Sequence, residues 1–279
     1  MPDQSVLNRR EFLKLLTAGA ALSVSHRWLP ILASECDGDD FVPPLPEYIP
    51  VPPSLMLHSR HRWRFPAMLE YLAEAGFTGI TYADLNRAIL GEIRLPDKSI
   101  LISIDDLSPF QGNPSYEYFA AMKDTLVEYG FKGTFSVITR PDQLPDEARW
   151  EEVIGWIEAG IALETHTAFH SYLDNPNFTA RDYEAEIIES AQFITARSGV
   201  AVCALITPYG SGYNPETGEI NPQVAAACRE ADIRFVVGIA GGRTPISTAI
   251  TTDTVVCLGR VGPGLTNDAD GALYEMEHW

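Results

Sequence analysis

The chain has 279 residues, a formal net charge of −18 and 46% hydrophobic residues. This acidic balance argues against nucleic acid as a partner, because phosphate binding needs a basic face, and it favours neutral or cationic partners. None of the four cysteines has the CxxC spacing of a zinc knuckle. Cys203 and Cys257 lie in apolar, strand-like runs, where we expect buried thiols.

The first residues resemble an export signal. Arg9 and Arg10 precede an apolar stretch over residues 15–24, which is too short to span a bilayer as a mature helix. Paired arginines in this position are typical of twin-arginine signals, although an amphipathic helix is the alternative. We therefore expect residues 1–35 to be a signal peptide. The mature protein is expected in the periplasm, cell envelope or extracellular space, without a stable membrane span.

Residues 36–53 are rich in proline and acidic side chains. Proline fixes φ and lacks a backbone donor, so this segment is expected to be an extended tether or a wrap across the domain surface. Residues 54–279 are then the folded part, whose length suits one sizeable α/β domain.

From residue 54 on, strand-like and helix-like segments alternate. Strands are expected at 55–58, 79–81, 100–106, 134–138, 161–164, 201–206, 235–238 and 255–258. Helices are expected at 66–75, 84–90, 119–129 and 150–159, after a capping box at Thr179, and at 222–231. Repeated β-α units imply a parallel sheet with right-handed crossovers. Seven or eight such strands are expected to close into a barrel, rather than stay open, with the chemistry at the carboxyl ends of the strands.

Two adjacent carboxylates, Asp105 and Asp106, end the most apolar strand. Successive strand residues point to opposite faces, so the two side chains are not expected to share one role. Two like charges this close raise each other's pKa unless a cation or strong donors compensate. The alternative is that the pair only caps a turn before Pro109.

Two histidines follow the expected strand at 161–164. His166 and His170 are four residues apart and can meet one ion as neutral imidazoles. The pair alone is a weak signal, but its place at the presumed barrel mouth strengthens the interpretation. One carboxylate and two imidazoles leave open coordination positions, as a catalytic ion requires.

The third segment of interest, Thr-Pro-Tyr-Gly, follows the strand at 201–206. Pro208 favours an extended Thr207, and Gly210 lets the backbone turn close to a ligand. In a functional interpretation the backbone N–H groups around Tyr209 point at a developing oxyanion. An ordinary turn after a strand is the alternative.

The motifs Ser-Ile-Asp-Asp (103–106), His-Thr-x-x-His (166–170) and Thr-Pro-Tyr-Gly (207–210) occur in this order, each after an expected strand. Together they resemble the polysaccharide deacetylase family, the NodB-homology domain of carbohydrate esterase family 4. The resemblance covers roughly residues 54–261. It implies a distorted (β/α) barrel of about seven parallel strands.

The resemblance also implies roles for single residues. Asp105 matches the general base, and Asp106 matches the metal-binding aspartate. His166 and His170 match the two histidine ligands of a divalent ion, for which zinc is expected. Tyr209 matches the residue whose backbone N–H helps to bind the oxyanion, and its neighbours Pro208 and Gly210 are expected to contact the substrate.

This chain departs from the family pattern in three places. Leu107 stands where many members have glycine, and Ile206 stands where many have an arginine that orients the base. Arg260 stands where many have the histidine that acts as general acid. A branch resembling poly-N-acetylglucosamine deacetylases also lacks that arginine and has an early strand-end histidine. His58 fits that branch and is the expected acid.

The implied activity is hydrolysis of N-acetyl, or alternatively O-acetyl, groups on a polysaccharide or oligosaccharide. Two other functions are compatible with the sequence. The departures at Ile206 and Arg260 would suit a carbohydrate-binding protein with impaired catalysis on the same fold. A small-molecule amide hydrolase of the same superfamily is the other possibility.

Replacing Arg9 and Arg10 with lysines should trap the precursor inside the cell, because the twin-arginine route depends on the arginine pair. Cell fractionation followed by immunoblotting measures the exported share. Undisturbed export of the doubly substituted chain would count against this route.

Overall fold

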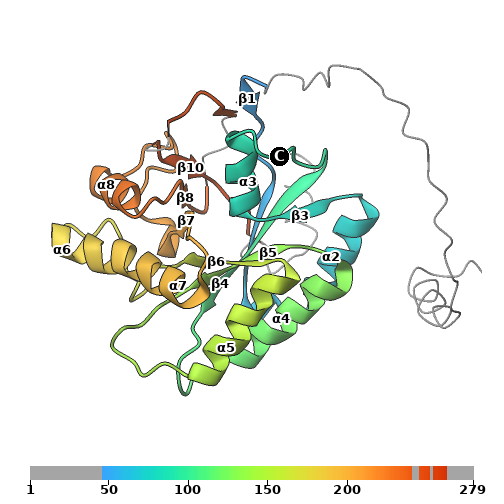
Figure 1. Cartoon of the computed structure of the whole chain (residues 1–279), viewed down its shortest axis with the longest axis horizontal. Coiled ribbons are helices and arrows are strands. Elements are labelled where there is room, and N and C mark those ends of the chain that lie inside the picture. Colours follow the sequence, from blue (N-terminus) through green and yellow to red (C-terminus); the bar gives the residue numbers. More distant parts are fainter. Residues whose placement is uncertain (1–45, 241–244, 252–253, 263–279) are drawn as a thin grey trace, which may run out of the picture. The chain divides into compact units, whose positions relative to one another are not determined.

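The computed structural model describes residues 46–240, 245–251 and 254–262, and the expected signal peptide lies outside them. Helices and strands alternate along the described part of the chain (Figure 1). The strands are β1 (Tyr48–Ile49), β2 (Ser54–His58), β3 (Thr78–Ile80), β4 (Ser99–Leu107), β5 (Gly133–Val137), β6 (Ile161–Thr165), β7 (Ala204–Ile206), β8 (Phe235–Val237), β9 (Ile246–Ser247) and β10 (Val256–Leu258).

The helices lie mainly between successive strands of the sheet. The α-helices are α2 (Phe65–Glu74), α3 (Tyr82–Ile89), α4 (Tyr116–Tyr129), α5 (Glu147–Gly155), α6 (Ala180–Tyr183), α7 (Ser190–Ser198) and α8 (Pro222–Glu230). Short 3₁₀ turns are η1 (Ser59–His61), η2 (Trp156–Ala159) and η4 (Pro208–Gly210), and η3 (Glu184–Glu189) is a π-helical segment. Within the described ranges, no helix is both long and apolar enough to cross a membrane.

The parallel sheet curls into a distorted barrel. Its strands follow the order β10-β8-β7-β6-β5-β4-β2, and β3 pairs with β4 beside this path. The two ends meet just beyond β10, where Val261 forms a parallel bridge with Leu55. Met56 N donates to Val261 O at 2.8 Å, and Val261 N donates to Ser54 O at 2.8 Å. The predicted fold is thus confirmed, and the bridge brings the last described segment next to the first strand of the barrel.

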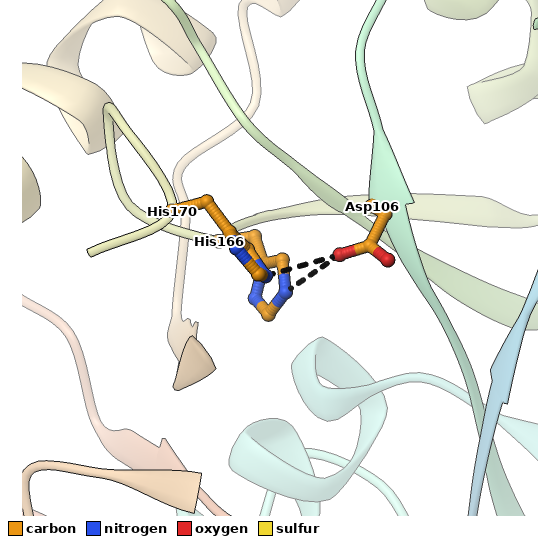
Figure 2. Close-up of side chains that lie close together, drawn as sticks. All are labelled: Asp106, His166 and His170. Carbon is orange, nitrogen blue, oxygen red and sulfur yellow. Dashed lines mark ion pairs between the residues drawn. The ribbon is translucent and has the colours of Figure 1, made fainter. Parts of the chain in front are cut away.

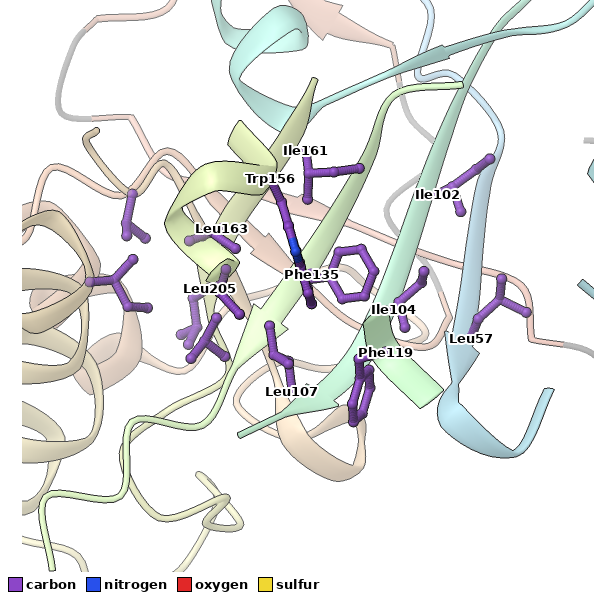
Figure 3. Close-up of a cluster of buried hydrophobic side chains, with 14 of the residues drawn as sticks. Leu57, Ile102, Ile104, Leu107, Phe119, Phe135, Trp156, Ile161, Leu163 and Leu205 are labelled. Carbon is purple, nitrogen blue, oxygen red and sulfur yellow. The ribbon is translucent and has the colours of Figure 1, made fainter. Parts of the chain in front are cut away.

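Side chains of β4 alternate between two environments. Ile100, Ile102 and Ile104 belong to the apolar cluster that they share with the surrounding helices, and Figure 3 shows Ile104 beside Phe135 in this cluster. The intervening side chains point the other way, because strand residues alternate in direction. Leu101 belongs to a separate apolar cluster, which places the alternate face of β4, including Ser103, on the barrel interior. The buried strand predicted from the apolar run is confirmed.

Strand β7 begins at Ala204 rather than at the expected residue 201, and the cause is a buried carboxylate. Glu164 of β6 accepts hydrogen bonds from the backbone N–H groups of Cys203 and Ala204, each at 2.8 Å, so these groups do not join the ladder. Burial raises the pKa of Glu164 to about 7, although these donors oppose the shift. Cys203 is a buried free thiol, as expected, whereas Cys257 is a half-buried one.

Packed structure begins before the predicted boundary at residue 54. β1 lies within the proline-rich segment and pairs antiparallel with β9. Ile49 and Val51 are buried, and Pro53 O accepts a hydrogen bond from Leu101 N at 2.9 Å. Apolar side chains between the prolines therefore attach residues 48–53 to the domain surface.

Gly79 of β3 offers a direct test of this packing. A Cβ atom at Gly79 would lie 2.5 Å from Lys132 O and 2.8 Å from Lys132 N, and backbone cannot easily give way. We expect Gly79→Ala to lower the free energy of unfolding by about 1–3 kcal/mol, measured by denaturant titration. Gly155, at the end of α5, has open space around it, so Gly155→Ala should leave stability unchanged or raise it by up to about 1 kcal/mol. Equal effects of the two substitutions would contradict this packing.

Candidate active site

A β-bulge at the end of β4 separates the two adjacent aspartates. Ile104 pairs with Phe135 and Leu107 pairs with Val137, so two residues of β4 oppose one residue of β5. Asp106 has a φ of 73°, an uncommon conformation for a residue other than glycine. Bulges near active sites redirect side chains. Here Asp105 is buried, whereas the Asp106 side chain is 40% exposed.

Three side chains meet at the mouth of the barrel. Oδ1 of Asp106 lies 3.2 Å from Nε2 of His166 and 3.2 Å from Nε2 of His170, as Figure 2 shows. One ligand atom from each residue lies within 4.8 Å of the other two. The structure thus brings the three predicted metal ligands together, from the end of β4 and the segment after β6.

The hydrogen bonding of His166 fits a cation at this point. Nδ1 of His166 lies 2.6 Å from Ile206 O, a carbonyl that can only accept, so Nδ1 carries the proton. Nε2 of the neutral ring is then an acceptor, and it faces Asp106 Oδ1, which has no hydrogen-bond donor among the described residues. Two acceptors this close call for a positive charge between them, and a carboxylate with two imidazoles suits a divalent ion such as zinc.

Burial would raise the pKa of Asp106, but imidazoles that donate from Nε2 outweigh it and hold the pKa well below its usual range; where Nε2 is an acceptor, a bound cation would take over this role. The carboxylate is therefore ionised at neutral pH and available as a ligand.

The π-helical segment η3 holds the histidine loop in place. Glu186 O accepts a hydrogen bond from Ala168 N at 3.1 Å, and its carboxylate accepts from Phe169 N at 3.0 Å and from Ser171 Oγ. Thr167 and His170 adopt positive φ values of 65° and 59°. Such strained conformations persist where the surroundings over-determine them. Helical periodicity predicts one regular helix here, so this contact could not be anticipated from the pattern.

Asp105 is enclosed by donors on the inner side of the barrel. Nη1 of Arg260 lies 2.8 Å from both carboxylate oxygens, and Oδ1 also accepts from Ser103 Oγ at 2.8 Å and Ser136 Oγ at 3.0 Å. Burial raises the pKa of Asp105, but Arg260 more than offsets this, and the pKa lies below its usual value. Asp105 is therefore an ionised, fixed carboxylate.

Arg260 is the functional residue that sequence reasoning missed. The sequence pattern marks it only as a departure from the expected histidine, yet its buried guanidinium is a partner for Asp105, which Ile206 cannot be. Nε of Arg260 donates to Gly238 O at 3.0 Å, which fixes the side chain. A usable signal was its position just after the last expected strand, because closing a barrel brings that strand end beside β2.

His58 is the last residue of β2 and lies in register with Asp105 of β4. Its Nε2 is 3.9 Å from Asp106 Oδ2, and its buried Nδ1 has no hydrogen-bond partner among the described residues. Burial lowers the pKa of His58, while the charges of Asp105 and Asp106 oppose this shift. The backbone N–H of His58 donates to Nδ1 of His61 at 2.9 Å, which fixes the strand end.

The turn Pro208–Gly210 forms η4 beside His170. Tyr209 has a φ of 58° and Gly210 has a φ of 64°. The Tyr209 hydroxyl is hydrogen-bonded to Nδ1 of His170 at 3.0 Å, so the phenol helps to orient that ring. Pro208 is buried below the turn. The oxyanion role of the Tyr209 N–H stays a prediction.

Comparisons with known proteins bear on the family and on the fold. The family model described as Polysaccharide deacetylase matches residues 92–236. The fold is similar to PplD of Streptococcus pyogenes, solved in complex with acetate, at 16% identity over 81% of this chain and 99% of that one, with a TM-score of 0.61. It is also similar to IcaB of Ammonifex degensii, at 18% identity over 81% and 97% of the two chains, with a TM-score of 0.60. A search of curated proteins found no match.

His166→Ala should lower the affinity for a divalent ion at least about 10- to 100-fold, because it removes a direct ligand. Asp105→Asn is the matched control and should retain the ion, because Asp105 is bonded to Arg260 rather than to the histidines. Metal analysis after dialysis measures both. Unchanged metal content in His166→Ala, or loss of the ion in Asp105→Asn, would show that the ligands are wrongly assigned.

Proposed function

Since the chain belongs to the polysaccharide deacetylase family, we propose that it is a metal-dependent hydrolase that removes N-acetyl groups from a polysaccharide. The observation that carries this proposal is the pairing of two unlike sites on one strand end. A buried, ionised Asp105 lies next to Asp106, which forms a ligand set with His166 and His170. The proposed ion is zinc.

A divalent ion bound by these three side chains supplies positive charge that polarises an acetyl carbonyl and acidifies a water molecule. Asp105 then acts as general base. Its Oδ2 is bonded only to Arg260 among the described residues and can accept the proton of the attacking water. Arg260 keeps this carboxylate ionised and in one orientation. In this proposal Asp106 is a metal ligand and Asp105 is the general base.

His58 is the proposed general acid. It closes β2 at the same end of the barrel as Asp105, and its ring lies beside Asp106. Burial lowers the pKa of His58 although the two carboxylates oppose the shift, so a proton bound to the ring is held weakly and can pass to the leaving amine. The backbone N–H of Tyr209 is proposed to stabilise the negative charge that develops on the carbonyl oxygen.

Two observations bear on the other candidate functions. A carbohydrate-binding protein with impaired catalysis was one alternative, because Ile206 stands where many members have an arginine. In the structure, however, Arg260 supplies a guanidinium to Asp105 from another strand end. Activity on O-acetyl groups or on a small amide needs the same base and ligands. Those alternatives therefore differ from the proposal in substrate alone. The predicted export signal fits a cell-envelope polymer.

Acetate release tests the proposed function directly. Purified protein with added zinc is incubated with chitin oligomers, poly-N-acetylglucosamine, peptidoglycan and acetylxylan, and acetate is measured enzymatically. We expect release from at least one N-acetylated polymer, and at least about a hundredfold lower rate for Asp105→Asn. Release only from acetylxylan would favour the O-acetyl alternative. Binding to a polymer without any release would favour the impaired protein.

His58→Gln should slow hydrolysis of an unactivated acetamide by at least about a hundredfold, because the leaving amine needs a proton. Hydrolysis of 4-nitrophenyl acetate, whose leaving group needs none, should fall much less. The rates on the two substrates measure this split. An equal loss on both would indicate a structural role for His58, and an unaffected acetamide would leave the acid to another group.

A further inference from the structure

The exposed aromatic side chains gather at one end of the barrel. Six aromatic side chains among the described residues are more than a third exposed: Tyr48, Trp63, Tyr118, Phe169, Tyr172 and Tyr209. All except Tyr48 follow the carboxyl end of a strand, which is the end that bears the candidate active site. Scattered exposed apolar residues need no explanation, but a group around one mouth indicates a ligand with apolar faces.

These aromatics lie on two sides of the mouth. Phe169, Tyr172 and Tyr209 belong to the segments after β6 and β7. Trp63 follows β2 and η1, and Tyr118 lies in the first turn of α4, which follows β4. In the strand order, β5 separates these two sides. Asp106 ends β4 and the histidines follow β6, so the candidate ligand set joins the two sides that carry the exposed rings.

Trp63 and Tyr118 are linked by a stacked arginine. The guanidinium carbon of Arg62 lies 3.7 Å from the ring centre of Tyr118 and 4.5 Å from that of Trp63. Nη1 of Arg62 donates to Ser59 O at 3.1 Å, which ties the stack to the turn directly after His58. Cation–π contacts hold the rings in place, yet Trp63 is still 79% exposed.

This combination suits a sugar ring. The C–H face of a pyranose packs on an aromatic ring, while its hydroxyl groups need nearby donors and acceptors. Trp63 offers an open apolar surface, and the remaining N–H groups of Arg62 offer donors beside it. Aromatic side chains give large contact area at low entropy cost, because few torsions are fixed on binding.

We propose that Trp63, Arg62 and Tyr118 form a sugar-binding platform at the rim of the active site, for a residue of the polymer other than the one that loses its acetyl group. The inference rests on the proposed function and specifies its substrate as a chain of several sugars. Such a chain crosses the mouth from the platform toward the aromatic residues after β6 and β7. A small-molecule amide hydrolase has no use for the platform.

The test compares two substrates that differ in reach. A soluble hexamer of N-acetylglucosamine can contact both the platform and the active site, whereas 4-nitrophenyl acetate contacts the active site only. We expect Trp63→Ala to lower the ratio of kcat/KM for the hexamer to that for the ester by about five- to thirtyfold. Trp63→Phe should recover most of the ratio, because it keeps an aromatic face.

Tyr48→Ala is the control. Tyr48 is also an exposed aromatic residue, but it lies on β1, which leads into the amino end of β2, so its substitution should leave the ratio unchanged.

A binding measurement separates failure of the platform from failure of the proposed function. Binding of the hexamer to Asp105→Asn, followed by calorimetry, should weaken by a similar factor when Trp63→Ala is added. If the parent protein releases no acetate but this weakening is seen, the function fails and the platform stands. An unchanged ratio and unchanged binding in Trp63→Ala would overturn the platform. Equal losses on both substrates would likewise overturn it, since they would indicate a structural role.

Discussion

The buried ion pair between Asp105 and Arg260 is the interaction on which the candidate site depends. Both side chains are almost fully enclosed, and a single nitrogen of the guanidinium reaches both carboxylate oxygens. Removing one partner of a buried pair typically costs about 3–5 kcal/mol, because the other charge is left without compensation. Arg260 directly precedes Val261, whose bridge to Leu55 closes the sheet and brings this segment beside the first strand of the barrel. Closing the barrel therefore also places the positive charge that keeps Asp105, the proposed base, ionised.

The bulge in β4 solves a second electrostatic problem. Two carboxylates in sequence would normally disfavour each other's ionisation. The positive φ of Asp106 sends the two side chains to different surroundings, where Arg260 compensates Asp105 and the imidazoles compensate Asp106. Each aspartate keeps its charge for a separate reason, which lets neighbours in the sequence take unlike roles.

Much of this arrangement could be predicted from the sequence. Alternating β and α segments indicated a parallel barrel, and strand-end motifs indicated Asp106, His166 and His170 as one ligand set, which lie together in the structure. The order of the motifs identified the family. These features depend on local patterns and on the rule that parallel strands deliver their carboxyl ends to one face.

The remaining features depend on contacts between residues far apart in the chain. Arg260 meets Asp105 across 155 positions, and Glu164 takes the amides of Cys203 and Ala204 across about 40. The π-helical turn that brings Glu186 under the histidine loop has no periodic signal. β1 was hidden because prolines dominate its segment, although Ile49 and Val51 bury their side chains. Periodicity describes neighbours along the chain, and each of these contacts is decided by packing in three dimensions.

The closing bridge between Leu55 and Val261 also has a meaning for the order of assembly. The contact joins two ends of the domain, so its loop-closure entropy is met late in folding, and during synthesis Arg260 leaves the ribosome after every ligand and Asp105 have done so. Until the segment that carries Arg260 is in place, Asp105 lacks the counter-charge that it has in the closed barrel. Under the proposed function, the general base therefore gains its fixed partner only when the two ends of the barrel have come together.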